Sequence, residues 1–283
     1  MNGMLLIDKP SGMTSFDVIA ILRKKLRIRK IGHTGTLDPE ATGLLLVLAG
    51  NATKLVPFMD YAEKEYEAEY VLGYTSDTYD TSGKLTEVPF DKIPQEDTVR
   101  AALKKLTGTL TQVPPKYAAI RVQGKHLYEY AREGKEIEVP SREITVFSHE
   151  YLSSEGRIVR VRVRCSSGTY VRSLAHDFGE ILGVPAVMGH LRRTSIGRFS
   201  VKDALKLEEI PADVRDIRFL TPYEILKDYP YAEWDNTADV IAGKTLKLNR
   251  TEALVMVTHG KEVLAAYENA GNGYYRCKRG LLR

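Results

Sequence analysis

The chain has 283 residues, 43% hydrophobic and 28% charged, with 22 glycines and 12 prolines, a globular composition that excludes collagen-like and low-complexity sequences. The net charge is +4, and two cysteines, too few for a disulfide framework, favour a cytoplasmic protein. Apolar runs such as residues 43–50 fall far short of the roughly 20 residues of a membrane span, and residues 4–7 are too short for a signal peptide.

The first quarter of the chain predicts strands around one helix. Thr14 or Ser15 can cap this helix, with Asp17 in its first turn, where the helix dipole favours an anion. The helix carries Phe16, Ile19, Ala20 and Leu22. The apolar runs and the alternating pattern predict strands at residues 4–8, 44–49 and 66–72.

The middle of the chain predicts two longer helices and one strongly alternating strand. Apolar residues recur at helical spacing in residues 99–106 and 170–182, each followed by a glycine. Residues 157–164 alternate arginine and valine, so arginines should occupy one face of a strand. Residues 127–132 predict a short helix inside a basic, aromatic insertion, residues 114–142. Strands and helices without a regular βαβ rhythm indicate an α+β fold.

The composition changes over residues 211–228, and a second domain is predicted after this point. A short helix at residues 237–242 and weak strands at 254–257, 262–267 and 274–278 suffice for a small β-rich unit. We expect one domain at residues 1–222 and a second at 223–283.

Positive charge is clustered in two places. Residues 23–30 hold six cations and no acid, and residues 156–172 hold five arginines and no acid. Such clusters suit a polyanion, because neutralising phosphates releases counterions. Either cluster is equally compatible with a solvated face.

Residues 32–43 are rich in Gly and Thr and are predicted as a loop that presents Asp38. Two glycines widen the accessible backbone conformations, and Pro39 restricts Asp38 to an extended geometry, so the carboxylate is held on a constrained turn. An Asp-Pro turn is also a common structural feature. The loop lacks a P-loop ending and metal-ligand spacing, and residues 77–83 lack the acids of a calcium loop and are predicted as a solvated turn.

The motif GHTGTLDPEATG at residues 32–43 resembles the catalytic motif of the TruB family, the bacterial tRNA pseudouridine-55 synthases. Further segments resemble the family in the same order: LIDKP (6–10) with GMTS (12–15), KEY (64–66), PPKYAAI (114–120) with LY (127–128) and AREG (131–134), and GTYVR (168–172) with LRR (191–193). Together they cover about residues 3–200.

The resemblance implies a fold and an isomerase activity. The fold is a central mixed, mostly antiparallel sheet with flanking helices, followed by a small PUA-like RNA-binding domain. The family breaks the uridine N-glycosidic bond in the tRNA T-loop, at position 55, turns the flipped-out base and re-attaches it through carbon. No metal or organic cofactor is expected, and the partner is the tRNA T-arm, bound by a monomer without an obligate protein partner.

The resemblance also implies roles for single residues. Asp38 matches the nucleophile, and Arg172 its guanidinium partner, which offsets the rise in carboxylate pKa that burial causes. Tyr66 matches the pocket tyrosine that stacks on the base. The remaining substrate-binding residues implied are His33, which supports the opened RNA loop, Tyr170, Leu191 and Lys9. The insertion matches an RNA-gripping loop, suited to phosphates and unpaired bases.

Two alternatives remain open at this stage. A non-catalytic RNA-binding or RNA-folding protein could use the same scaffold without needing Asp38. A two-carboxylate N-glycoside hydrolase would pair Asp38 with a second acid, such as Asp8 or Glu40, and would release free uracil.

Overall fold

A computed structural model describes residues 2–59, 63–118, 120–122, 124–135, 137–211 and 213–281. Within these ranges, ten strands form one sheet in the order β14-β1-β3-β12-β4-β11-β10-β7, with β2 beside β3 and β13 beside β12. The strands are β1 (Gly3–Lys9), β2 (Ile31–Thr34), β3 (Thr42–Ala49), β4 (Lys64–Leu72), β7 (Gly108–Gln112), β10 (Arg142–Glu155), β11 (Ile158–Cys165), β12 (Ala186–Ile196), β13 (Phe199–Ser200) and β14 (Leu205–Lys206). Among these described strands, β1–β14 and β3–β12 pair in parallel and the other pairs are antiparallel, as predicted for a mixed sheet.

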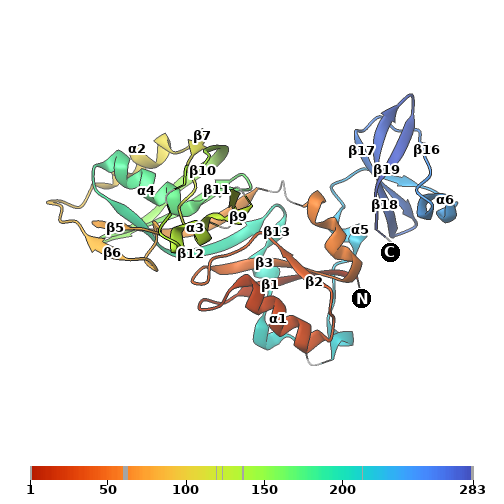
Figure 1. Ribbon diagram of the computed structural model, residues 1–283, viewed down its shortest axis with the longest axis horizontal. Coiled ribbons are helices and arrows are strands. Elements are labelled where there is room, and N and C mark those ends of the chain that lie inside the picture. The colour runs from red at the N-terminus through yellow and green to blue at the C-terminus, as the bar shows by residue number, and fades with distance from the viewer. Residues whose placement is uncertain are drawn as a thin grey trace.

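One half of the sheet is covered by α2 (Glu96–Lys105) and α4 (Val171–Leu182), which appear at the left of Figure 1. Both helices were predicted from their apolar spacing, and Gly183 ends α4 in the left-handed conformation with φ of 70°. Their buried faces pack on the apolar residues of β4, β11 and β12 in one core.

The other half carries α1 (Ser15–Leu26), which packs on β1 and β3. The helix begins at a capping box, in which Thr14 and Asp17 satisfy each other's backbone amides. The predicted apolar residue Phe16 is 71% exposed and Ala20 is also exposed, because Val18 takes the inward position. The predicted loop begins later than expected, since residues 31–34 form β2.

Strand β3 is apolar on both faces, which explains its uninterrupted hydrophobic run. Leu44, Leu46 and Leu48 face one core with the 3-10 helix η1 (Gly50–Phe58), and the alternate residues face the core under α1. A strand buried on both sides fixes the position of the loop that precedes it.

The C-terminal part forms a separate sheet in the order β15-β17-β18-β19-β16, shown at the right of Figure 1. Its elements are β15 (Tyr231–Glu233), α6 (Thr237–Ile241), β16 (Leu246–Lys247), β17 (Leu254–His259), β18 (Glu262–Gly271) and β19 (Tyr274–Gly280). The predicted boundary after residue 222 falls inside α5 (Pro222–Ile225), so we propose that the second unit begins beyond this helix.

Short elements complete the described chain. They are the hairpins β5 (Tyr74–Ser76) with β6 (Leu85–Glu87) and β8 (Arg121–Val122) with β9 (Lys125–His126), the helix α3 (Leu127–Arg132), and the 3-10 turns η2 (Val201–Asp203), η3 (Leu207–Glu209) and η4 (Val214–Asp216). The short helix of the insertion was predicted at these residues. Ala119, in one of the family-like segments, lies outside the described residues. Among the described helices, none is long and apolar enough to span a membrane.

Candidate active site

The turn between β2 and β3 holds Asp38 through backbone contacts on both sides. The Ser15 hydroxyl accepts from the Leu37 amide at 3.0 Å and donates to the Leu37 carbonyl at 3.2 Å. Two residues further on, the Pro39 carbonyl accepts from the Lys9 ammonium at 2.9 Å. The first turn of α1 and the end of β1 therefore fix the backbone that presents Asp38.

Lys9 has a structural role rather than the predicted contact with substrate. Its side chain is fully buried, and its ammonium donates to the carbonyls of Pro10, Met13 and Pro39 at 2.6–2.9 Å. An ammonium has three protons, so these acceptors use them all. We therefore do not retain Lys9 among the substrate-binding residues.

Arg172, in the first turn of α4, connects that helix with three other parts of the chain, one of which is the Asp38 turn. Its Nε lies 3.2 Å from Asp38 Oδ2, and its Nη1 lies 3.4 Å from Asp80 Oδ2. The guanidinium also donates to the carbonyls of Thr78 and Tyr117. These partners engage all three guanidinium nitrogens and leave Arg172 only 6% exposed, so its charge is held in one place.

Burial is the main influence on the pKa of Asp38, and it raises that pKa. The Arg172 guanidinium opposes the rise, the Asp80 carboxylate adds to it, and the Lys9 ammonium opposes it from further away. The side chain keeps 42% of its accessible surface because it lines a cavity. The carboxylate of Asp38 therefore pairs with a cation and is accessible from a cavity.

The cavity has a volume of about 290 Å³, near the small end of ligand pockets. Five of the predicted site residues line it: Asp38, Tyr66, Tyr170, Arg172 and Leu191. Tyr66 lies on β4, Leu191 on β12, and Tyr170 immediately before α4. Burial raises the pKa of Tyr66, so its ring is an un-ionised apolar surface at neutral pH.

Tyr170 is held from behind. Its amide donates to Gln112 Oε1 at 2.8 Å, and its carbonyl accepts from Gln112 Nε2 at 3.1 Å. The guanidinium of Arg142 lies 4.8 Å from the centre of its ring. A ring fixed in this way can present a flat face to a ligand without further ordering.

His33 does not line this cavity. It lies on β2, edge-on to the exposed Phe16 ring at 5.3 Å between ring centres. Burial lowers the pKa of His33, and the Arg193 charge lowers it further, so the imidazole is neutral at physiological pH. The pair forms an aromatic contact at the start of the turn that carries Asp38.

Asp80 was missed by the sequence reasoning, which predicted a solvated turn at residues 77–83. Asp80 is 7% exposed, and its Oδ1 accepts from the Thr78 hydroxyl, the Ser82 hydroxyl and the Ser82 amide at 2.5–3.0 Å. The sequence around it is an ordinary turn sequence, because the feature that matters is the ion pair with Arg172, 92 positions away.

The two acids proposed as partners in a hydrolase are engaged elsewhere. Asp8 forms a bidentate ion pair with Arg192, at 2.7 and 3.0 Å. Glu40 accepts from the Ser11 hydroxyl at 2.8 Å. Neither acid belongs to the ion-pair network of Arg172.

The insertion lies next to the ion pair of Asp38 and Arg172. A second cavity, of about 610 Å³, has a mixed lining that includes two acids and two lysines: Asp77, Lys116, Tyr117, Leu127, Gly134, Lys135, Ile137, Glu138 and Val139. The Tyr117 carbonyl, which accepts from Arg172 at 3.2 Å, joins the insertion to the active site. The side chains of Arg121, His126, Tyr128 and Arg132 lie outside the described residues.

The arginine-rich strand is not the free positive surface that its composition suggested. Arg160, Arg162 and Arg164 pair with Glu69, Glu67 and Glu63 at 2.8–3.0 Å. The strand register places Arg160 opposite Glu69 and Arg162 opposite Glu67 on β4. This arginine ladder, as we call these three residues, is therefore largely neutralised.

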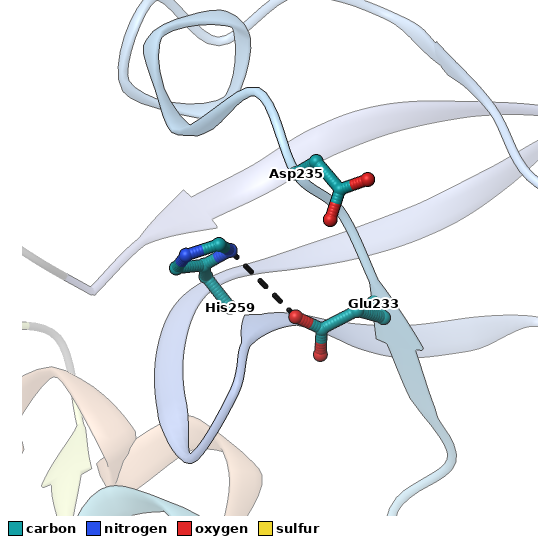
Figure 2. Close-up of side chains that lie close together, drawn as sticks. All are labelled: Glu233, Asp235 and His259. Carbon is teal, nitrogen blue, oxygen red and sulfur yellow. Dashed lines mark ion pairs between the residues drawn. The ribbon is translucent and has the colours of Figure 1, made fainter.

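The C-terminal sheet carries a small group of possible metal ligands, Glu233, Asp235 and His259, shown in Figure 2. Their ligand atoms lie within 4.8 Å of one another, and all three residues are exposed. Glu233 already accepts from the Thr258 hydroxyl at 3.0 Å and from the Gly260 amide at 2.7 Å. These bonds explain the position of Glu233 as a cap on the turn between β17 and β18, so we assign no metal to the group.

The fold is shared with chains of two solved complexes. The chain superposes with a TM-score of 0.74 and 25% identity on a chain of "Structure of H/ACA RNP bound to a substrate RNA containing 2'-deoxyuridine", covering 99% of this chain and 85% of that one. It superposes with a TM-score of 0.75, at the same identity and coverage, on a chain of a Cbf5-Nop10-Gar1 complex.

The sequence matches a class of RNA-isomerising enzymes over most of its length. Residues 23–171 match the family described as TruB family pseudouridylate synthase (N terminal domain), and residues 172–220 match the tRNA pseudouridylate synthase B C-terminal domain. The chain belongs to the TruB family and is a pseudouridine synthase, an isomerase.

Curated relatives agree over nearly the full length. The chain is 42% identical over 287 residues to tRNA pseudouridine synthase B of Streptococcus pneumoniae serotype 4, covering 97% of this chain and 98% of the relative. It is 44% identical over 243 residues to the protein of that name from Bacillus anthracis, covering 81% and 78%.

Proposed function

We propose that the enzyme converts a uridine in the tRNA T-loop, at position 55, to pseudouridine, with Asp38 as the nucleophile. The observation that carries this proposal is the pairing of Asp38 with Arg172 at a cavity lined by two tyrosines and Leu191. The relatives named tRNA pseudouridine synthase B support tRNA as the substrate class.

The site residues suit chemistry on an extruded base. A base inside an RNA stack cannot reach a carboxylate that lies inside a cavity, so the nucleotide must first be flipped out at a cost of a few kcal/mol. Stacking on an aromatic ring returns about 1–3 kcal/mol per base, and Tyr66 and Tyr170 offer such rings. The neutral His33, which contacts the exposed Phe16 and lies two residues before the cavity-lining Gly35, can pack against the opened loop.

The reaction needs no external reactant. The bond from ribose to the uracil nitrogen breaks, the base turns, and the ribose bonds to a uracil carbon. That carbon loses a proton and the released nitrogen gains one, so the product has the same composition as the substrate. Asp38 must be ionised to act as a nucleophile, and the Arg172 charge favours the ionised form against burial. Because a base in the cavity covers the exposed face of Asp38, substrate binding increases the need for this cation.

RNA affinity requires positive charge outside the cavity. The exposed cations of residues 23–30, at the end of α1, supply it, and Lys116 of the insertion extends it to the second cavity. We include the C-terminal sheet, residues 231–280, as an RNA-binding unit.

Asp38→Asn tests the catalytic assignment. The amide keeps the shape of the carboxylate and cannot act as an anionic nucleophile, so we expect pseudouridine formation in a T-stem-loop RNA to fall below detection. The dissociation constant for that RNA should stay within about threefold, because base contacts are retained. A transcript with one uridine, labelled with heavy hydrogen at the base carbon that bonds to ribose, measures the product as loss of that label. The same transcript shows any free uracil as a released labelled base.

Glu40→Gln is the matched control, since Glu40 is a carboxylate two residues away that hydrogen-bonds Ser11 rather than Arg172. Its turnover should stay within about threefold of the unmodified enzyme. Undiminished turnover by Asp38→Asn would contradict the assignment, and release of uracil by the unmodified enzyme would indicate hydrolysis instead.

A further inference from the structure

Strand β12 joins the two halves of the active site. It pairs with β3, which follows the Asp38 turn, on one edge, and with β4, which carries Tyr66, on the other. One residue of β12, Arg193, stands opposite Gly43 on β3 and opposite Tyr66 on β4. The orange β3 and the teal β12 cross near the middle of the molecule in Figure 1.

The contact between β12 and β3 is close enough to require glycine. A Cβ on Gly43 would lie 2.2 Å from the Arg193 carbonyl oxygen and 2.8 Å from its nitrogen, and the φ of Gly43 is +100°. Backbone atoms cannot give way as a flexible side chain can. The backbone of Arg193 is therefore fixed relative to the start of β3.

Arg193 is the largest fully buried side chain among the described residues, with 1% exposed. Its Nε donates to the Leu44 carbonyl at 2.7 Å, and its Nη2 donates to the Gly35 carbonyl at 3.0 Å. No carboxylate in the described ranges pairs with it. A buried cation is costly unless polar groups replace the water around it. Here the backbone carbonyls of Gly35 in the Asp38 loop and of Leu44 on β3 replace that water.

The same guanidinium reaches the other half of the site at Tyr66. Arg193 stands opposite Tyr66 in the pairing of β12 with β4, and both residues line the same cavity. Burial raises the pKa of the Tyr66 hydroxyl, and the charge of Arg193 acts in the opposite direction. On the other side, Gly35 has a left-handed φ of +69°, and its carbonyl accepts from the same guanidinium. One side chain thus contacts the loop of Asp38 and lines the cavity beside Tyr66.

We propose that Arg193 is a positioning residue for the isomerisation, which sets the spacing between the Asp38 turn and the Tyr66 ring. This inference rests on the proposed roles of those two residues. A planar guanidinium can donate to two carbonyls in fixed directions, as Arg193 does to Leu44 and Gly35, and a lysine ammonium cannot reproduce this geometry. A one-ångström change in such a spacing is enough to slow chemistry without weakening binding.

Arg193→Lys keeps the buried charge and tests the geometry. We expect the single-turnover rate of pseudouridine formation at saturating T-stem-loop RNA to fall about 30-fold, with the dissociation constant within about threefold. The matched control is Arg192→Lys, on the same strand, where the guanidinium pairs with Asp8 instead. Its single-turnover rate should stay within about threefold.

A double variant separates positioning from general support of the fold. If Arg193 acts partly through the Tyr66 hydroxyl, Arg193→Lys should slow the Tyr66→Phe enzyme by at least threefold less than it slows the unmodified enzyme. The thermal unfolding midpoint of each variant is measured alongside its rate, to show whether the variant is folded.

Three results would overturn the proposal: a wild-type rate for Arg193→Lys, a variant that loses affinity and rate in parallel or does not fold, or strictly multiplicative effects with Tyr66→Phe. An unmodified enzyme that makes no pseudouridine in the T-stem-loop RNA would instead overturn the proposed function. The two failures are therefore distinguishable.

Discussion

Arginines occupy two contrasting settings in this molecule. The arginine ladder on β11 lies on an outer face, 38–44% exposed, and each member meets a glutamate from β4 or just before it. Arg172 and Arg193 are at most 6% exposed, and their partners come from turns far away in the sequence. Exposed ion pairs contribute about 0–1 kcal/mol to folding stability, whereas removing the partner of a buried charge is strongly destabilising. The number of cations in a segment therefore says less than the environment of each one.

The largest effect expected from this comparison follows removal of the Arg172 charge. Arg172→Met leaves the Asp38 and Asp80 carboxylates near each other without a cation, so the pKa of Asp38 should rise further. We expect the single-turnover rate at pH 7 to fall about 100-fold or more, in line with the 2–5 kcal/mol cost of truncating a buried ion pair. Part of the loss should recover as the pH is raised, because Asp38 then ionises.

The matched change on the outer face is Arg162→Met, which removes the pair with Glu67. Its rate should be unchanged at every pH. Equal losses from the two variants would show that burial does not distinguish the two settings.

A buried group in the core extends the comparison from arginine to histidine. His149 is 8% exposed, its Nε2 lies 3.1 Å from the Tyr70 hydroxyl, and burial lowers the pKa of its imidazole from 6.5 to about 4. The unfolded chain binds a proton at His149 below about pH 6.5 and the folded chain does not until about pH 4. The stabilising contribution is therefore present above pH 6.5 and is lost as the pH falls towards 4.

This dependence predicts a loss of about 2 kcal/mol of folding stability at pH 5 relative to pH 7.5 from His149 alone. His149→Gln should remove that part of the slope, as measured by denaturant unfolding across this pH range. If the variant and the unmodified protein lose stability in parallel between pH 7.5 and 5, His149 is not the group responsible.

The smallest effect concerns RNA affinity and distinguishes the two basic segments. Within the described residues, Lys24, Arg29 and Lys30 are exposed and have no carboxylate partner. Replacing all three by Gln should reduce the slope of log affinity against log salt by up to about 2–3, since each phosphate contact contributes about 0.7–0.9. Filter binding or fluorescence titration at several salt concentrations measures this slope.

The corresponding triple change in the arginine ladder, Arg160, Arg162 and Arg164 to Gln, should leave the slope unchanged. Its glutamates already neutralise those charges. A reduced slope in the ladder variant alone would reverse the assignment of the RNA-binding surface.

The sequence by itself determined most of the local structure and the class of site. Period-two and helical spacings placed β4, β11, α2 and α4, and the turn before Pro39 was identified as the carrier of a constrained carboxylate. These features depend on neighbours a few residues apart, which is the range over which backbone geometry and side-chain periodicity act. The ordered motifs then indicated the family, which the comparisons confirmed.

Only the tertiary structure decided which charges face each other. From the sequence, Asp80 is predicted as a turn residue, and only the fold places Arg172 of α4 against it. Lys9 is predicted as a pocket residue, and only the fold surrounds its ammonium with three carbonyls. The glutamates that neutralise the arginine ladder come from a strand that lies beside β11 only after folding. Electrostatic energy depends on distance and on the exclusion of water, and both are set by contacts between segments far apart in the chain.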